Sequence, residues 1–139
     1  MQLRILVVDD HPSIRRMLRT FLELNPEWNV CGEAADGWEA VAQTTDLHPD
    51  VIIMDLEMPR LNGLEATRKI HKMSPSSRIL ILTLHENSSL PKIAQDSGAQ
   101  GYVLKSEPFD VLTRAIETVG GSDRFFVSPH LFSQKTGSL

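Results

Sequence analysis

The stretch LRILVVDDHP, residues 3–12, contains the clearest structural signal in the chain. Its apolar run shows no polar alternation after Arg4, which predicts a strand buried on both faces, as in a parallel sheet. The run ends in Asp9 and Asp10. Pro12 follows at the place of a first helical turn, which tolerates proline because the amide hydrogen that proline lacks has no partner there. The stretch therefore predicts a buried strand, an acidic turn and the start of a helix.

The same strand–helix unit recurs along the chain. After Pro12 the apolar residues have the i, i+3, i+4, i+7, i+8 spacing of a one-sided helix. Further apolar runs at 30–34, 51–54, 79–82 and 102–104 alternate with helical patterns at 37–45, at 62–73, from Pro91 to about Ser97, and at 111–119. Gly98 is placed to end the short fourth helix in a left-handed conformation. The pattern predicts an α/β fold, a doubly wound five-stranded parallel sheet of flavodoxin-like order 2-1-3-4-5 with helices on both faces.

Composition excludes several classes of protein. The chain has 139 residues and a formal net charge of -4, which suits one domain and makes it a poor ligand for nucleic-acid phosphates by itself. Its single cysteine, Cys31, allows no internal disulfide and is interpreted as core filling, so a reducing cytoplasmic location is expected. No apolar stretch approaches the ~20 residues of a membrane span, and no signal peptide is visible.

The periodic pattern stops at Gly120, and this predicts a domain over residues 1–119 followed by a linker or tail over 120–139. The tail contains the apolar residues Phe125, Phe126, Leu131 and Phe132. Exposed apolar residues of this kind normally face a partner surface. The sequence leaves open whether they face a further domain or fold back onto this one.

Polar residues of complementary kinds follow four of the predicted strands: Asp9 and Asp10, then Asp55, Thr83 and Lys105. In open α/β sheets, ligands bind beyond the carboxyl ends of the strands where the strand order reverses, here between the first and third strands. Three carboxylates in one cleft favour a bound cation, and an all-oxygen cluster favours Mg²⁺. An aspartate can attack phosphorus and form an acyl phosphate, while lysine and threonine can contact the phosphoryl oxygens.

Each of these residues also has a simpler explanation. The two aspartates could cap the first helix, Asp55 could lie in an ordinary loop, Thr83 could be a strand residue, and Lys105 could be a solvated surface charge. The joint arrangement at four strand ends favours a phosphoryl-transfer site.

At this point the sequence resembles the response-regulator receiver family, over roughly residues 3 to 119. The segments that carry the resemblance are Val7-Val8-Asp9-Asp10-His11, Met54-Asp55-Leu56-Glu57-Met58-Pro59, Asn62-Gly63, Leu82-Thr83 and Gly101-Tyr102-Val103-Leu104-Lys105. The openings Asp-Asp-His-Pro and Asn-Gly-Leu-Glu-Ala-Thr are similar to the NarL/LuxR-like branch, whose members carry a C-terminal helix-turn-helix.

The resemblance implies a Mg²⁺-dependent site. It implies that Asp55 accepts a phosphoryl group from a sensor histidine kinase. It also implies that Asp10 and Asp55 ligate Mg²⁺ directly together with the backbone carbonyl of Glu57, whereas Asp9 acts through water.

It further implies that Lys105 pairs with the phosphoryl oxygens and that Thr83 and Tyr102 form a switch pair. Pro59 and Gly63 would shape the loop after the acceptor, Gly63 through its tolerance of unusual backbone angles.

The implied function is a receiver domain of a two-component response regulator that controls a transcriptional effector. Such a domain is a switch rather than an enzyme, since it catalyses only its own phosphorylation and dephosphorylation. The implied partners are the kinase, a second copy on phosphorylation, and DNA only through a C-terminal domain beyond this chain. A membrane is not among the partners.

The chain departs from the family pattern near the site. Ser106 follows Lys105 where many members have proline, and a cis bond before a non-proline residue costs about 3–4 kcal/mol, so a trans bond is expected. Leu84 stands where many members have a small residue and is expected to narrow access to the acyl phosphate. His85 and Glu57 are either solvated loop residues or modulators of water access.

Three other functions compete with this interpretation. A haloacid-dehalogenase-like enzyme would have an aspartate two residues after its nucleophile, where this chain has Glu57. A flavodoxin-like electron carrier would need a Ser-, Thr- and Gly-rich phosphate loop after the first strand, where this chain has acidic residues. A stand-alone phosphorelay shuttle remains the alternative within the leading class.

Overall fold

The computed structural model describes residues 2–131. They form a six-stranded sheet in the order β2-β1-β3-β4-β5-β6 with every neighbouring pair parallel. The strands are β1 (Leu3–Val8), β2 (Trp28–Ala34), β3 (Val51–Met54), β4 (Arg78–Thr83), β5 (Gly101–Leu104) and β6 (Phe126–Val127). The helices are α1 (Pro12–Leu22), α2 (Gly37–Leu47), α3 (Gly63–Met73), α4 (Leu90–Ser97) and α5 (Phe109–Gly121).

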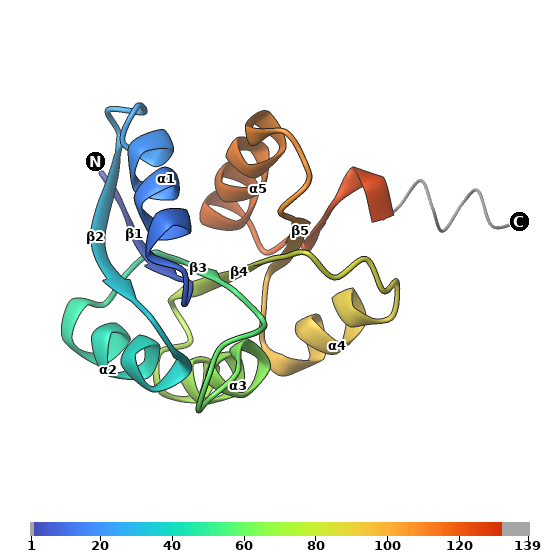
Figure 1. Cartoon of the computed structure of the whole chain (residues 1–139), viewed down its shortest axis with the longest axis horizontal. Helices are drawn as coiled ribbons and strands as arrows, with labels where there is room; N and C mark the ends of the chain where they lie inside the picture. The colour runs from blue at the N-terminus through green and yellow to red at the C-terminus, as the bar shows by residue number, and fades with distance from the viewer. Residues whose placement is uncertain (1, 132–139) are drawn as a thin grey trace, which may run out of the picture.

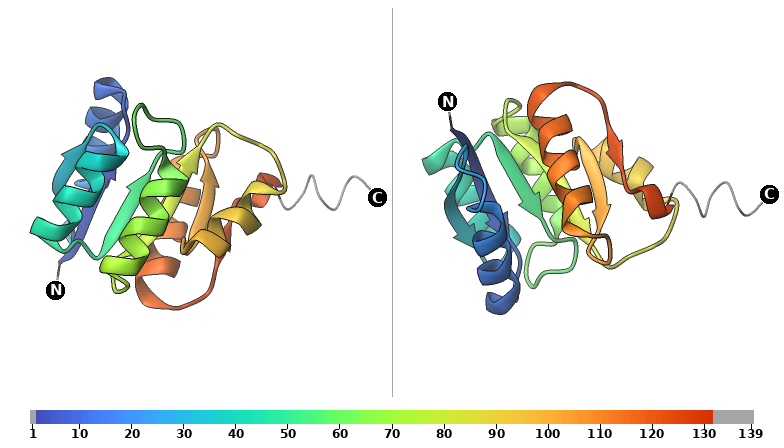
Figure 2. Two further views of the ribbon diagram at one scale, coloured as in Figure 1. Left: turned by 90° about the horizontal axis from the view of Figure 1, so that it is seen from below. Right: turned by 90° about the horizontal axis from the view of Figure 1, so that it is seen from above.

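The helices cover the sheet on both faces, as Figures 1 and 2 show. Helices α1 and α5 pack on one face, where Leu18, Leu22 and Ile116 join Ile5 and other strand residues in one apolar cluster. Helices α2, α3 and α4 pack on the other face over a second cluster. Strands β1, β3 and β4 lie between both clusters, which is why their sequences are apolar without alternation. No helix within residues 2–131 is long and apolar enough to cross a membrane.

The predicted fold class and the order of the first five strands are confirmed. Pro12 opens α1 as expected, but the cap residue of that helix is His11, which makes no side-chain cap bond, so the two aspartates are not its caps. Pro91 lies in the first turn of the short helix α4, and Gly98 ends it at φ 113°.

The strand count needs a correction. The segment after α5 was expected to be a tail, yet Phe126 and Val127 pair in parallel with Gly101 and Tyr102 and add a sixth strand. Residues 129–131 are helical, and the side chain of Leu131 is buried. The described part of the tail therefore folds back on this domain, because its backbone pairs with the edge of β5 and its apolar side chains pack against the core. Phe132 and the rest of the predicted tail lie outside the described residues.

Gly63 shapes the loop after β3 for a different reason from the one the sequence indicated. Among the described residues the only glycine with a positive φ is Gly98, so Gly63 needs no unusual backbone angle. A Cβ at Gly63 would instead collide with the backbone carbonyl oxygen of Asp55. The start of α3 must therefore approach the end of β3 more closely than any side chain permits.

Candidate functional site

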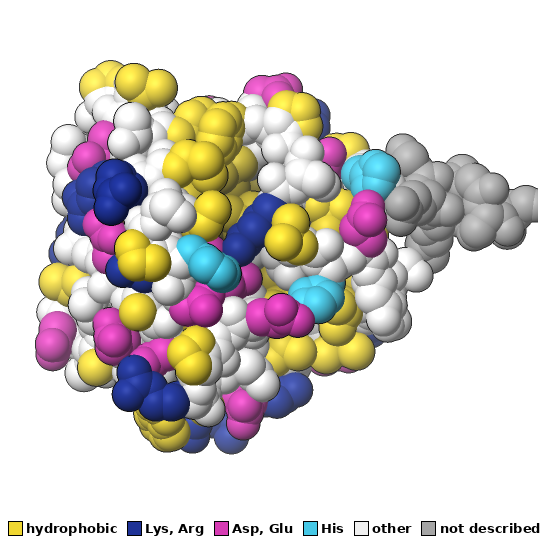
Figure 3. Space-filling view, viewed as in Figure 1, with side chains coloured by type: hydrophobic (Ala, Val, Ile, Leu, Met, Phe, Trp, Pro, Cys, Tyr) yellow, Lys and Arg dark blue, Asp and Glu magenta, His cyan; other side chains and the backbone are white. Residues whose placement is uncertain are grey.

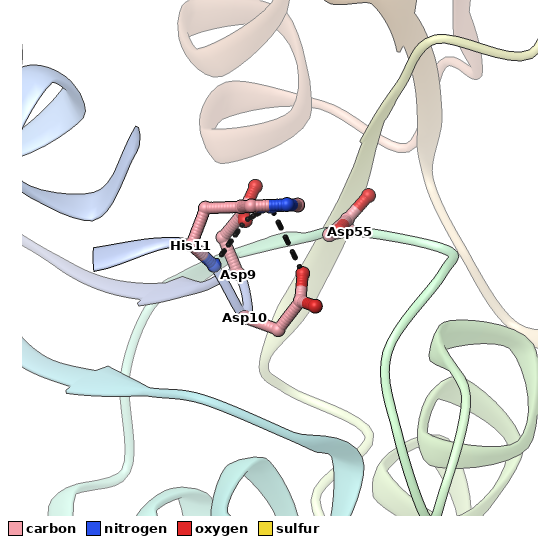
Figure 4. A group of neighbouring side chains, drawn as sticks. All are labelled: Asp9, Asp10, His11 and Asp55. Atoms are coloured by element: carbon pink, nitrogen blue, oxygen red, sulfur yellow. Dashed lines mark hydrogen bonds and ion pairs between the residues drawn. The ribbon is translucent and has the colours of Figure 1, made fainter. Parts of the chain in front are cut away.

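Three carboxylates converge where β1 and β3 end. Asp9, Asp10 and Asp55, together with His11, each place one potential ligand atom within 4.8 Å of the others. Figure 4 shows Asp9, Asp10 and His11, which follow β1, close to Asp55, which follows β3. Asp9 and Asp55 are buried, with 1% and 5% of their surfaces exposed. The predicted site residues at the first and third strand ends are therefore brought together, because parallel neighbours end at the same edge.

Asp9 is held in a fixed position by three neighbours. Its Oδ1 accepts a hydrogen bond from the backbone N–H of His11 at 2.9 Å, and its Oδ2 accepts one from Lys105 Nζ at 2.8 Å. Its backbone carbonyl accepts a hydrogen bond from Arg15 Nη1 at 2.6 Å. Arg15 was not foreseen, since an arginine on an amphipathic helix gives no sign of turning back to the preceding loop.

Lys105 bridges the buried acids from the end of β5. Its Nζ lies 2.8 Å from Asp9 Oδ2 and 3.4 Å from Asp55 Oδ1. Burial disfavours the charged ammonium, but the hydrogen bond to Asp9 and the charges of both aspartates outweigh burial and raise the pKa of Lys105. Its amine is therefore a permanent cation. The Lys105–Ser106 peptide bond is trans, as predicted.

Asp55 is the member of the cluster whose charged form is disfavoured. Burial raises the pKa of Asp55, and the negative charges of Asp9 and Asp10 add to this effect, whereas Lys105 opposes it. A buried carboxylate beside two others gains from any further positive charge. This environment favours a cation or a charge-neutralising reaction at Asp55.

The donor set fits Mg²⁺. Within residues 2–131, Asp10 Oδ1 is a buried oxygen without a hydrogen-bond partner, and His11 Nδ1 lies 3.1 Å from it without making one. An unpartnered buried carboxylate oxygen is costly unless something positive approaches it. Carboxylate oxygens in small number, with room for water and a phosphoryl group, are the ligands that Mg²⁺ prefers.

The remaining predicted residues meet at the backbone of His85. Thr83 Oγ1 accepts a hydrogen bond from the N–H of His85 at 3.2 Å, and the Tyr102 hydroxyl donates one to the His85 carbonyl at 2.8 Å. Tyr102 is fully buried, and burial raises its pKa to about 12. The two predicted switch residues are thus both hydrogen-bonded to the backbone of one loop residue.

A cleft of about 850 Å³ opens above the acids. Its lining includes Asp55, Glu57, Thr83, His85 and Lys105. In the view of Figure 3, acidic, basic and histidine side chains gather near the middle of this face. The cleft is large enough for a phosphoryl group and water.

His85 and Glu57 meet at the mouth of the cleft, with 2.6 Å between Nε2 and Oε1. The sequence singled out each residue but gave no sign that they form a pair, because they follow different strands. Leu84 beside them is 73% exposed and lines the same cleft. Its expected effect on access to the acyl phosphate stays a prediction.

Fold and site together define a class of protein: a doubly wound α/β domain with an acidic cleft, crossed by one lysine, at the point where strand order reverses. Residues 5–117 match the response regulator receiver domain family. The chain belongs to this family.

The relatives that resemble this chain are named as regulators, in agreement with the family match. The chain is 36% identical over 118 residues to the transcriptional regulatory protein DegU of Brevibacillus brevis, and this alignment covers 85% of this chain and 50% of DegU. It is 37% identical over 123 residues to the nitrate/nitrite response regulator protein NarP of Escherichia coli, and this alignment covers 88% of this chain and 57% of NarP. The chain thus spans little more than half the length of these relatives.

A solved structure is similar over nearly the whole chain. The two-component response regulator of the LuxR family from Aurantimonas sp. SI85-9A1 superposes with a TM-score of 0.92 at 38% identity, over 99% of this chain and 98% of that one. These likenesses support the NarL/LuxR-like branch.

Proposed function

We propose that this receiver domain is a phosphorylation switch in which Asp55 accepts a phosphoryl group from the phosphohistidine of a sensor kinase in a Mg²⁺-dependent reaction. The observation that carries the proposal is the position of Asp55. It is a buried carboxylate, its pKa is raised by burial, and Lys105 Nζ lies 3.4 Å from its Oδ1.

The chemistry follows from the same geometry. A carboxylate oxygen of Asp55 forms a bond to phosphorus while the phosphorus–nitrogen bond to the kinase histidine breaks, and the imidazole leaves with the electron pair. The amine of Lys105 pairs with the phosphoryl oxygens as it shifts away from Asp9. Asp10, Asp55 and the backbone carbonyl of Glu57 would hold Mg²⁺, with Asp9 acting through water. The bound ion would supply positive charge to the transferring group.

The response is a population shift between two arrangements. In this proposal Thr83 swings its hydroxyl toward a phosphoryl oxygen and gives up the hydrogen bond that it accepts from His85 N–H. The Tyr102 hydroxyl donates a hydrogen bond to the carbonyl of the same residue, so a displacement of His85 would affect both switch residues. The surface around α4 and β5 then changes.

Glu57 and His85 are proposed to control the lifetime of the phosphoryl group. Their 2.6 Å contact closes part of the cleft mouth through which water must approach Asp55. On this view the domain catalyses only its own phosphorylation and dephosphorylation, and it acts as a switch rather than as an enzyme on other substrates.

The output is proposed to be transcription. DegU and NarP are named as regulators, and this chain covers about half of each. By analogy the receiver, residues 1–119, and the following segment, residues 120–139, lead to a C-terminal helix-turn-helix domain that enters the major groove. The receiver at net charge -4 would not bind DNA itself. Dimerisation on phosphorylation and a cytoplasmic location belong to the same proposal.

The test is phosphorylation by acetyl phosphate with and without Mg²⁺, followed by intact mass. One labile phosphoryl group is expected on the wild-type chain and on the control Asp46→Asn, and none on Asp55→Asn. A full yield on Asp55→Asn would contradict the assignment. Steady turnover of simple phosphate monoesters would instead favour a hydrolase.

A further inference from the structure

The segment Phe126–Leu131, here termed the strap, lies along the outer edge of β5, at the opposite end of the sheet from β2 (Figures 1 and 2). Besides the pairing of Phe126 and Val127 with β5, its backbone donates two hydrogen bonds. The N–H of Phe126 donates to the carbonyl of Gln100 at 3.0 Å, and the N–H of Ser128 donates to the carbonyl of Tyr102 at 2.9 Å. The strap is therefore bonded directly to the buried tyrosine of the proposed switch.

A single carboxylate fastens the end of the strap. The hydroxyl of Ser128 donates to Glu107 Oε2, and the N–H of His130 donates to the same oxygen at 3.2 Å. Ser128 is fully buried, so this contact is shielded from solvent on the strap side. Glu107 stands two residues after Lys105, in a turn closed by the bond from its own N–H to the carbonyl of Leu104 at 3.1 Å.

A third attachment joins the strap to the other side of the switch. Leu131 is only 2% exposed and belongs to the apolar cluster that contains Tyr102 and Leu104. His130 Nε2 lies 2.8 Å from Glu86 Oε1. Glu86 directly follows His85, whose backbone is bonded to both proposed switch residues.

Two of these attachments therefore lie on loops that carry proposed phosphoryl-binding residues, since Glu107 follows Lys105 and Glu86 follows Thr83. Lys105 Nζ lies 2.8 Å from Asp9 Oδ2 and 3.4 Å from Asp55 Oδ1, so a phosphoryl group on Asp55 would compete with Asp9 for this amine, two residues before Glu107. In the proposed switch Thr83 releases the N–H of His85, the residue that directly precedes Glu86. The strap itself has only a two-residue strand, and such short elements open at a low free-energy cost.

We propose that the strap is a latch, closed on β5 while Asp55 is unmodified and released when Asp55 carries a phosphoryl group. Glu107 is its catch, because its carboxylate accepts both hydrogen bonds at the end of the strap. The latch rests on the proposed function for its trigger. It connects the chemistry at Asp55 to the chain that follows residue 131, and it leaves the order of the first five strands unchanged.

The experiment is hydrogen–deuterium exchange of the whole chain, read by mass spectrometry on peptides that cover residues 124–131. Intact mass of the same sample reports whether Asp55 is phosphorylated by acetyl phosphate and Mg²⁺. Exchange of the strap amides is expected to accelerate on the order of tenfold in the phosphorylated protein, the factor that corresponds to about 1.4 kcal/mol. Peptides covering β1 report whether the fold as a whole is intact.

A variant tests the catch without phosphorylation. Glu107→Ala is expected to show strap exchange about tenfold faster than wild type while β1 stays protected, since it removes both acceptor contacts. The matched control is Glu117→Ala, which removes an exposed acid from α5 and is expected to leave the strap protected.

The outcomes separate the two proposals. A phosphorylated chain whose strap amides exchange at the wild-type unmodified rate overturns the latch and leaves the proposed function standing. Wild-type strap protection in Glu107→Ala overturns the role of Glu107. A chain that takes up no phosphoryl group overturns the proposed function and, with it, the trigger of the latch.

Discussion

Replacing Asp10 by asparagine is expected to stabilise the metal-free protein. Its carboxylate lies in a cluster whose ligand atoms are within 4.8 Å of one another, and its buried Oδ1 has no hydrogen-bond partner within residues 2–131. Two unit charges ~5 Å apart repel by about 3 kcal/mol at an effective dielectric constant of ~20. The side chain is 30% exposed and its contact with His11 is lost too, so the net gain is smaller, about 1–2 kcal/mol.

The same change is expected to weaken the response to Mg²⁺. A cation at 100 times its dissociation constant stabilises a folded protein by about 2.7 kcal/mol. The wild-type chain is expected to gain this amount, whereas Asp10→Asn gains much less, because it has lost one carboxylate ligand. The order of stability should therefore reverse, with the variant more stable in EDTA and the wild type more stable in saturating Mg²⁺.

Thermal unfolding in the two buffers measures both effects. A gain of 1–2 kcal/mol corresponds to a rise in Tm of roughly 3–8 °C for a domain of this size. Asp46→Asn removes the same charge from an exposed position on α2 and controls for net charge. A Tm in EDTA at or below that of wild type would refute the repulsion argument, and an unchanged Mg²⁺ response would refute the role of Asp10 as a ligand.

Three further predictions use the same structure. Lys105→Ala is expected to bind Mg²⁺, as measured by calorimetry, but to lose labelling by acetyl phosphate. Without metal its free energy of unfolding is expected to fall by about 2–4 kcal/mol, because the buried carboxylates lose their cation. Normal labelling of this variant would contradict the role of Lys105. Thr83→Ala is expected to accept the phosphoryl group while the NMR signals around Tyr102 stay as in the unmodified protein; a wild-type response there would exclude the coupling. The hydrogen bond from the N–H of Glu39, and to a smaller extent the contact with Arg60, hold the pKa of Asp36 below its ordinary value of 3.8 despite burial. The ionised carboxylate of Asp36 therefore stabilises the fold above pH 3.8, and this contribution is lost as the pH falls through the lowered pKa. Denaturation of Asp36→Asn should therefore show a weaker loss of stability in this acid range, and a pH profile identical to wild type would refute the assignment.

The site shows which of its features local sequence could reveal. The polar residues at four of the strand ends were predictable because a buried parallel strand is a continuous apolar run, and the first polar residue after it marks the edge where ligands bind. The contacts of His85 with Glu57 and of Arg15 with the Asp9 carbonyl were not predictable, since they join residues from different loops.

The sequence alone determined the five strand–helix units, the order of the first five strands and the meeting of Asp9, Asp10, Asp55 and Lys105. These features follow from apolar periodicity and from the handedness of strand–helix–strand connections, both of which are local or general properties of the chain. Only the tertiary structure decided that Phe126 and Val127 become a sixth strand and that Ser128 is bonded to Glu107. Two residues are too few to show a period, and a hydrogen bond between residues far apart in sequence depends on how the packed elements present them to one another. The fold is thus determined by repeated local patterns, whereas the attachment of the strap is determined by the edge that the finished sheet leaves open.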